Sequence, residues 1–170
     1  QRYYHKIQKS GIIENMEIRF AKKEDLPSIV ALARAMADVH HEIDPYYKPG
    51  AAHKTLADDF ANLLNDHDTI LVVAEINKKI IGYINMSVET IEYISAKKIG
   101  VINNAYIIPA HRRQGIAKAL FTLAEDWLHN KKKVEWIELN ADARNKNAVE
   151  LWSKLGFETY KLRMRKKLSH

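Results

Sequence analysis

The 170-residue chain contains no cysteine, only four prolines and only six glycines. Without cysteine, disulfides and thiolate metal sites are excluded, and a reducing compartment such as the cytoplasm is the expected setting. No apolar run approaches the roughly 18 residues of a membrane-spanning helix, so we expect no membrane segment. Hydrophobic residues make up 46% of the chain, which is enough for one domain with a core of its own.

The first fifteen residues have neither the apolar core nor the small-residue cleavage site of a signal peptide. A strand-like run, MEIRFA, begins directly after them at Met16. We therefore interpret residues 1–15 as an N-terminal extension or a remnant added to the protein, and we place a single domain at residues 16–170.

The formal net charge of +6 is distributed unevenly along the chain. Residues 1–15 carry a net charge of +2 and residues 161–167 a net charge of +5, which leaves the body at −1. A nucleic-acid-binding module needs basic and aromatic residues interleaved on one surface. Nucleic acid is thus not an expected partner, although a basic binding module is kept as an alternative.

Apolar periodicity along the chain predicts an alternation of strands and helices. Strands are expected at residues 16–20, 69–76, 79–89, 98–109 and 134–141, with a last strand or hairpin at 157–168. Helices are expected at residues 21–43, 56–64, 113–129 and 145–156, the first of them with Asp25 as its N-cap. This order predicts an α/β (α+β) fold with a mixed sheet and helices on both faces.

The sequence IPAHRRQGIAKALF, residues 108–121, joins a buried strand to a long helix. The first turn of a helix has backbone N–H groups without partners and a partial positive charge. Gly115 lets the backbone approach a ligand closely, and Arg112 and Arg113 add positive charge. The corner therefore fits a pyrophosphate, although an ordinary helix start with a solvated charged face would have the same residues.

Two motifs lie about thirty residues apart in the chain. Residues 112–117 read R-x-x-G-x-A, and residues 145–157 fit N-x-x-A-x-x-L-Y-x-K-x-G-F except at Trp152. Together they resemble the signature of the GCN5-related N-acetyltransferase (GNAT) family. The resemblance covers residues 16–165. It implies a mostly antiparallel central sheet of six or seven strands, acetyl-CoA as co-substrate and no metal.

The resemblance also implies which residues bind acetyl-CoA. The backbone of Ala105, Tyr106 and Ile107 would pair with the pantetheine arm, since that arm contains two amides and is itself peptide-like. Arg112 would add charge, and Asn145 would contact the cofactor, cap a helix, or do both. The pyrophosphate would be wrapped by the amides of Arg113, Gln114, Gly115, Ile116, Ala117 and Lys118.

Acetyl transfer to an amine requires a neutral nitrogen, a polarised carbonyl and a proton for the departing thiolate. The family's usual tyrosine is replaced by Trp152, whose N–H donates a hydrogen bond but releases no proton. Trp152 either stabilises the thiolate or packs. The glutamate found in some members is replaced by Asn103, which takes no proton. A base acting through water (Glu89, Glu92, Tyr106, His40 or His41) and transfer by positioning alone both stay open.

The acceptor side would be built around the loop VHHEIDPYYKPG, residues 39–50. No metal is expected there, because the adjacent His40 and His41 point apart on a helix. Tyr46 and Tyr47 either cover an apolar acceptor or anchor the loop. We expect an N-acetyltransferase for a primary amine of a small molecule or a peptide N-terminus. The alternative is an acyl-CoA-binding domain with little transfer activity. Besides the acceptor, a second copy of the chain is a possible partner.

Overall fold

The structure, a computed structural model, describes residues 16–93 and 95–168. The chain divides after Asn140 into two compact units, which are described separately. The first unit contains the sheet and the helices α1 to α3, and the second contains α4. The predicted extension at residues 1–15 lies outside the described residues, and a single domain over residues 16–170 stays a prediction.

The described residues form one sheet of five strands, which lie in the spatial order of the sequence. They are β1 (Met16–Phe20), β2 (Thr69–Ile76), β3 (Lys79–Thr90), β4 (Lys98–Ile107) and β5 (Ile137–Leu139). Neighbours from β1 to β4 pair antiparallel, whereas β4 and β5 pair parallel. The prediction of a mixed, mostly antiparallel sheet is confirmed, with five strands in place of six or seven.

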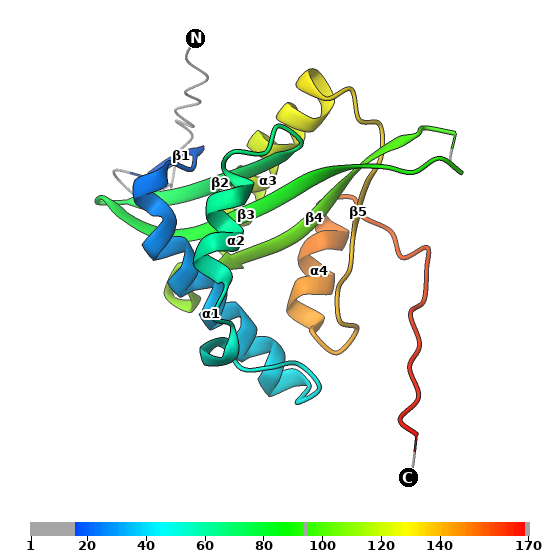
Figure 1. The fold of residues 1–170 in the computed structure, drawn as a ribbon, viewed down its shortest axis with the longest axis horizontal. Helices are drawn as coiled ribbons and strands as arrows, with labels where there is room; N and C mark the ends of the chain where they lie inside the picture. Colours follow the sequence, from blue (N-terminus) through cyan, green and yellow to red (C-terminus); the bar gives the residue numbers. More distant parts are fainter. Residues whose placement is uncertain (1–15, 94, 169–170) are drawn as a thin grey trace. The chain divides into compact units, whose positions relative to one another are not determined.

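Helices cover both faces of this sheet, as predicted (Figure 1). One face carries α1 (Leu26–Ile43) and α2 (Leu56–Leu63), which bury a cluster that includes Leu71, Val73 and Tyr83. Alternate residues of the same strands point to the opposite face, where α3 (Ile116–Asp126) packs. The core is therefore split into two layers by the sheet.

An ion cluster around the buried Asp25 connects β1 and β2 to the start of α1. The Arg19 guanidinium donates to both carboxylate oxygens of Asp25 (2.6 and 2.9 Å) and to Glu75 (2.6 Å). The backbone N–H of Lys22 also donates to Asp25. These bonds, the one from Arg19 above all, lower the pKa of Asp25. Asp25 does occupy the N-cap position of α1, but its carboxylate makes no capping hydrogen bond because it is used here.

Helix α3 begins at Ile116, three residues later than the apolar pattern predicts. Arg113 (φ +61°) and Gly115 (φ +79°) both have left-handed backbones, which an α-helix cannot continue through. After Asp126 the chain forms one π-helical turn, Trp127–Lys131. The predicted end at residue 129 therefore falls inside this turn.

The second unit consists of α4 (Lys146–Lys154) and an extended tail. Gly156 (φ +94°) ends the helix at the left-handed position that glycine favours. The prediction of a strand or hairpin at residues 157–168 is wrong, since the structure has no strand there. Tyr160, Leu162 and Met164 alternate with basic residues as in a strand, yet all three are exposed. Alternation alone does not supply the partner strand that a β-ladder needs.

Candidate functional site

A β-bulge interrupts β4 at Asn103. On β3, Asn85 pairs with Asn104 and Met86 pairs with Ile102, so Asn103 is the extra residue. The pairing of β4 with β5 covers only Gly100–Ile102 and stops at this bulge. This early stop explains why β5 has three residues instead of the eight predicted. Beyond Ile102 no described residue of the first unit pairs with the outer edge of β4, so this edge is open within that unit.

The bulge also decides which backbone groups face this open edge. Gly100 N–H donates outward, to Trp136 on the β5 side, whereas Ile108 N–H donates inward, to Ile81 on β3. Successive residues of a strand alternate in direction, so Tyr106 also faces β3 while Ala105 and Ile107 face the open edge. Two outward-facing residues at this spacing match a peptide-like arm laid along the strand.

The open edge leads directly into the corner between β4 and α3. A 3₁₀ turn, Pro109–His111, follows β4, and the left-handed residues Arg113 and Gly115 complete the corner. A Cβ atom built on Gly115 would meet no atom within 4 Å, so the space in front of its backbone is open. The amides in the first turn of α3 have no acceptor within the helix. The corner therefore fits an anionic group that touches backbone.

Arg112 connects the corner to the end of β4 through two contacts. Its Nε donates to the carbonyl oxygen of Ile107 (2.8 Å), and its guanidinium lies 5.3 Å from the centre of the Tyr106 ring. Arg113, Gln114 and Lys118 are exposed. Arg112 is exposed as well, so all three cations, Arg112, Arg113 and Lys118, add positive charge at the surface of the corner. The cofactor-binding roles of all these residues stay predictions.

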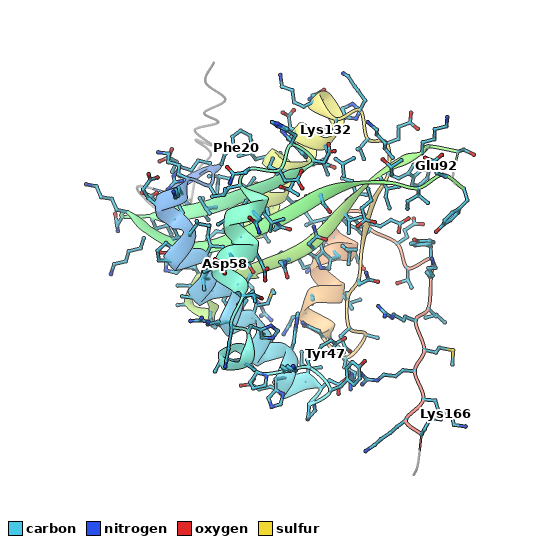
Figure 2. The ribbon with its side chains drawn as sticks, in the orientation of Figure 1. Phe20, Tyr47, Asp58, Glu92, Lys132 and Lys166 are labelled. Atoms are coloured by element: carbon cyan, nitrogen blue, oxygen red, sulfur yellow. The ribbon has the colours of Figure 1, made fainter. Side chains whose placement is uncertain are left out.

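The five groups considered as general bases lie in different places. Glu92 lies at the far tip of the β3–β4 hairpin, away from α1 and α2 (Figure 2). Glu89 is also exposed, and Tyr106 lies beneath Arg112. The His40 ring lies beside the Tyr47 ring, with centroids 6.0 Å apart. His41 Nδ1 is hydrogen-bonded to the carbonyl oxygen of Tyr47 (2.7 Å). Asn103 itself donates a hydrogen bond from Nδ2 to Ser87 Oγ (2.9 Å).

One buried residue of this region was missed by the sequence reasoning. Asn85 is 1% exposed, and neither atom of its carboxamide has a hydrogen-bond partner among the described residues. Its signal was visible, because Asn85 is the one carboxamide in the apolar run IIGYINMSV. Polar residues rarely interrupt a buried strand without a reason.

In the second unit, Asn145 and Trp152 both have local structural roles. The Asn145 side chain accepts a hydrogen bond from Ala148 N–H (3.2 Å) and so caps α4. The Trp152 ring packs edge-on against Phe157, with centroids 5.6 Å apart. Capping and packing were among the roles predicted for these two residues, and neither arrangement tests a contact with cofactor.

No group of three or more His, Asp or Glu side chains in the described ranges has an arrangement that could hold a metal ion. Among residues 16–93 and 95–168, no helix has both the length and the apolar character needed to cross a membrane.

Comparison with known proteins shows the family. Residues 36–157 match the acetyltransferase (GNAT) family. The chain belongs to this family. It is 24% identical over 143 residues to the uncharacterised N-acetyltransferase YhfO of Bacillus subtilis (strain 168), covering 84% of this chain and 90% of that protein. The N-alpha-acetyltransferase of Sulfurisphaera tokodaii is 24% identical over 150 residues, covering 85% and 81% of the two chains.

A solved structure agrees in fold. AAC(6')-Iy, in complex with the bisubstrate analogue CoA-S-monomethyl-acetylneamine, superposes with a TM-score of 0.71 at 18% identity, covering 92% of this chain and all of the other. The predicted fold and family are confirmed, and the protein is an acetyltransferase.

Proposed function

We propose that this acetyltransferase moves an acetyl group from acetyl-CoA to a primary amine, either of a small molecule or at a peptide N-terminus. The observation that carries the proposal is the continuous path from the open edge of β4 to the corner at Gly115. It offers strand-like backbone groups first and an anion site second, in the order in which a pantetheine arm and a pyrophosphate follow each other. The proposal leaves the acceptor open between these two classes, because one sequence relative is an N-alpha-acetyltransferase and AAC(6')-Iy, which shares the fold, is an aminoglycoside N-acetyltransferase.

The residues present fit acetyl-CoA. Ala105 and Ile107 would hold the arm through their outward backbone groups, and the amides from Arg113 to Lys118 would hold the pyrophosphate. When bound, acetyl-CoA supplies a thioester whose C–S bond breaks as the amine forms the C–N bond of the amide, with the amine's proton ending on the thiol.

The chain's own contribution to this reaction is mainly positioning. The bulge at Asn103 turns the Ala105 and Ile107 N–H groups outward, where one of them can donate to the thioester carbonyl and polarise it. Asn103 cannot accept a proton. Asn103 therefore does not deprotonate the amine, which arrives neutral or loses its proton through water, and alignment of the reactants supplies much of the rate.

Binding of acetyl-CoA tests this function directly. At a concentration one hundred times its Kd, the ligand should raise the melting temperature by roughly 5–10 °C. Release of thiol is then measured with a panel of peptide N-terminal amines, amino acids, polyamines and aminoglycosides. The proposal requires transfer to at least one class of primary amine. A protein that acetyl-CoA stabilises but that acetylates none of them would contradict transfer and leave binding intact.

A matched pair of variants tests where the phosphates of acetyl-CoA bind. Gly115→Asp introduces a carboxylate where the pyrophosphate is proposed to lie, and Gly115→Asn introduces a neutral side chain of nearly the same shape that tolerates a left-handed backbone. Both should fold, since no atom lies within 4 Å of the new Cβ. We expect Asp to weaken acetyl-CoA binding about tenfold more than Asn. Equal affinities in the two variants would refute this placement of the phosphates.

A further inference from the structure

Asn85 is a buried carboxamide on the sheet face that α1 and α2 cover. Its register partner on β2 is Leu71, which belongs to the core cluster under these helices, and its partner on β4 is Asn104. Both atoms of the Asn85 carboxamide lack a hydrogen-bond partner among the described residues. A buried amide without partners lowers stability. Its presence therefore points to a use outside folding.

Three polar residues accompany Asn85 on the same face. Asn104 lies directly across the strand pair, Ser87 is two residues further along β3, and Asn103 donates to Ser87 Oγ. We call Asn85, Ser87, Asn103 and Asn104 the amide strip. It lies at the bulge, where the outer edge of β4 opens. The strip is thus next to Ala105, the first residue proposed to hold the pantetheine arm.

The hydrogen bond between Asn103 and Ser87 determines which atom of the Asn103 carboxamide is available to a ligand. It engages the Asn103 amide nitrogen and leaves Oδ1 to accept. Asn104 is half-buried and Asn103 is exposed, so both are closer to solvent than Asn85. A neutral primary amine has two N–H donors and one lone pair. Two carboxamide oxygens can accept both N–H groups and leave the lone pair free for attack.

The neighbouring phenol does not supply the missing base. Tyr83, two residues before Asn85 on the same face, is fully buried, and its O–H is directed to Met36 Sδ (3.9 Å). Burial raises the pKa of Tyr83, so it stays protonated at neutral pH. The strip itself consists of three carboxamides and one hydroxyl, which carry no charge at neutral pH.

We propose that the amide strip is the acceptor-binding part of the acetyl-transfer site and that Asn85 is its positioning residue. Asn103 and Asn104 present their amide oxygens to the two N–H groups of a primary amine. When the amine is bound, the Asn85 carboxamide forms a hydrogen bond with the Asn104 carboxamide on the side away from the amine. This bond gives the buried Asn85 carboxamide the partner that it otherwise lacks. This inference rests on the proposed function and adds the residues that receive the acceptor.

The test separates stability from activity at one position. Asn85→Val removes the carboxamide and keeps a shape suited to a strand, and Asn85→Thr has the shape of valine but keeps a hydroxyl donor and acceptor. We expect Asn85→Val to melt at the wild-type temperature or about 2–4 °C above it. Its kcat/KM for the amine should fall about tenfold or more, with the KM for acetyl-CoA unchanged. Asn85→Thr should melt below Asn85→Val but recover about threefold in kcat/KM.

Met86→Leu is the control, because Met86 is buried beside Asn85 on the opposite face. It should keep kcat/KM within about twofold of wild type. A lower melting temperature for Asn85→Val would mean that the carboxamide is used in folding, and unchanged kcat/KM would mean that it is not used in catalysis. Either result overturns the inference while wild-type transfer stands. Absence of transfer by the wild-type protein would instead remove the proposed function, and this inference with it.

Discussion

Two buried polar sites in the first unit differ in one respect. Asp25 receives hydrogen bonds from Arg19 and Lys22, so its charge is paired where it is buried. Asn85 is more deeply buried and has no partner among the described residues. A paired buried group holds elements together, whereas an unpaired one is a cost to the fold. The comparison suggests that the first site serves structure and the second serves acetyl transfer.

The largest effect on stability is expected at the paired site, when Asp25 loses Arg19. Arg19→Met leaves the carboxylates of Asp25 and Glu75 close together without their shared cation. The free energy of unfolding, measured by urea denaturation, should fall by about 3 kcal/mol. Activity per folded molecule should not change.

Lys132→Met is the control for this substitution, because Lys132 pairs with an exposed carboxylate, Asp68. Its loss should lower the free energy of unfolding much less than the loss of Arg19 does, because solvent screens an exposed pair. If Arg19→Met costs no more than Lys132→Met, then the ion cluster around Asp25 is not the structural anchor that its geometry indicates.

The same cluster should give the protein a sensitivity to acid. The pKa of Asp25 is lowered in the folded protein, so its contribution to stability is complete above the unfolded value of about 3.9 and is lost as pH falls through the folded value. The stability difference between wild type and Arg19→Met should therefore shrink below about pH 4. A difference that stays constant from pH 7 to pH 3 would argue against the pairing.

At the unpaired site, the sign of the stability change should reverse. Asn85→Val removes a buried amide without partners, and we expect the free energy of unfolding to rise by about 1 kcal/mol. Chemical denaturation of this variant beside Arg19→Met gives the comparison directly. A loss of stability at both positions would abolish the distinction between them.

The smallest effect is expected at Ser87, which accepts a hydrogen bond from the exposed Asn103. Ser87→Ala should change the free energy of unfolding by less than about 0.5 kcal/mol. It frees the Asn103 amide to turn, so kcat/KM for the amine should fall about threefold. A larger loss in stability than in activity would place Ser87 with the structural residues.

The regular parts of the fold were predictable from local patterns. The strands at residues 16–20 and 69–76 and the helices α1 and α2 follow the apolar pattern, because their apolar residues are buried in the core. The corner at Gly115 was also predictable, because a glycine between an apolar strand and a helix indicates a sharp turn from the local sequence alone. The left-handed backbone of Arg113 was not, because arginine carries no such preference.

What could not be predicted depends on pairing between distant segments. The bulge at Asn103 exists only in the register of β4 against β3, and it shortens β5 and opens the edge of β4. The segment at residues 157–168 has the alternation of a strand but no strand partner. Asn85 was visible as a polar residue in an apolar run, yet only burial and the hydrogen bonds reveal that it is unpaired.

A double-mutant cycle between Asn85→Val and Asn104→Leu, measured as kcat/KM for the amine, tests the central claim most directly. If Asn85 acts through Asn104 to position the acceptor, the double variant should be no more than about twofold slower than the slower single variant. If the two losses multiply in full, the residues act independently, and the amide strip is not one acceptor-binding site.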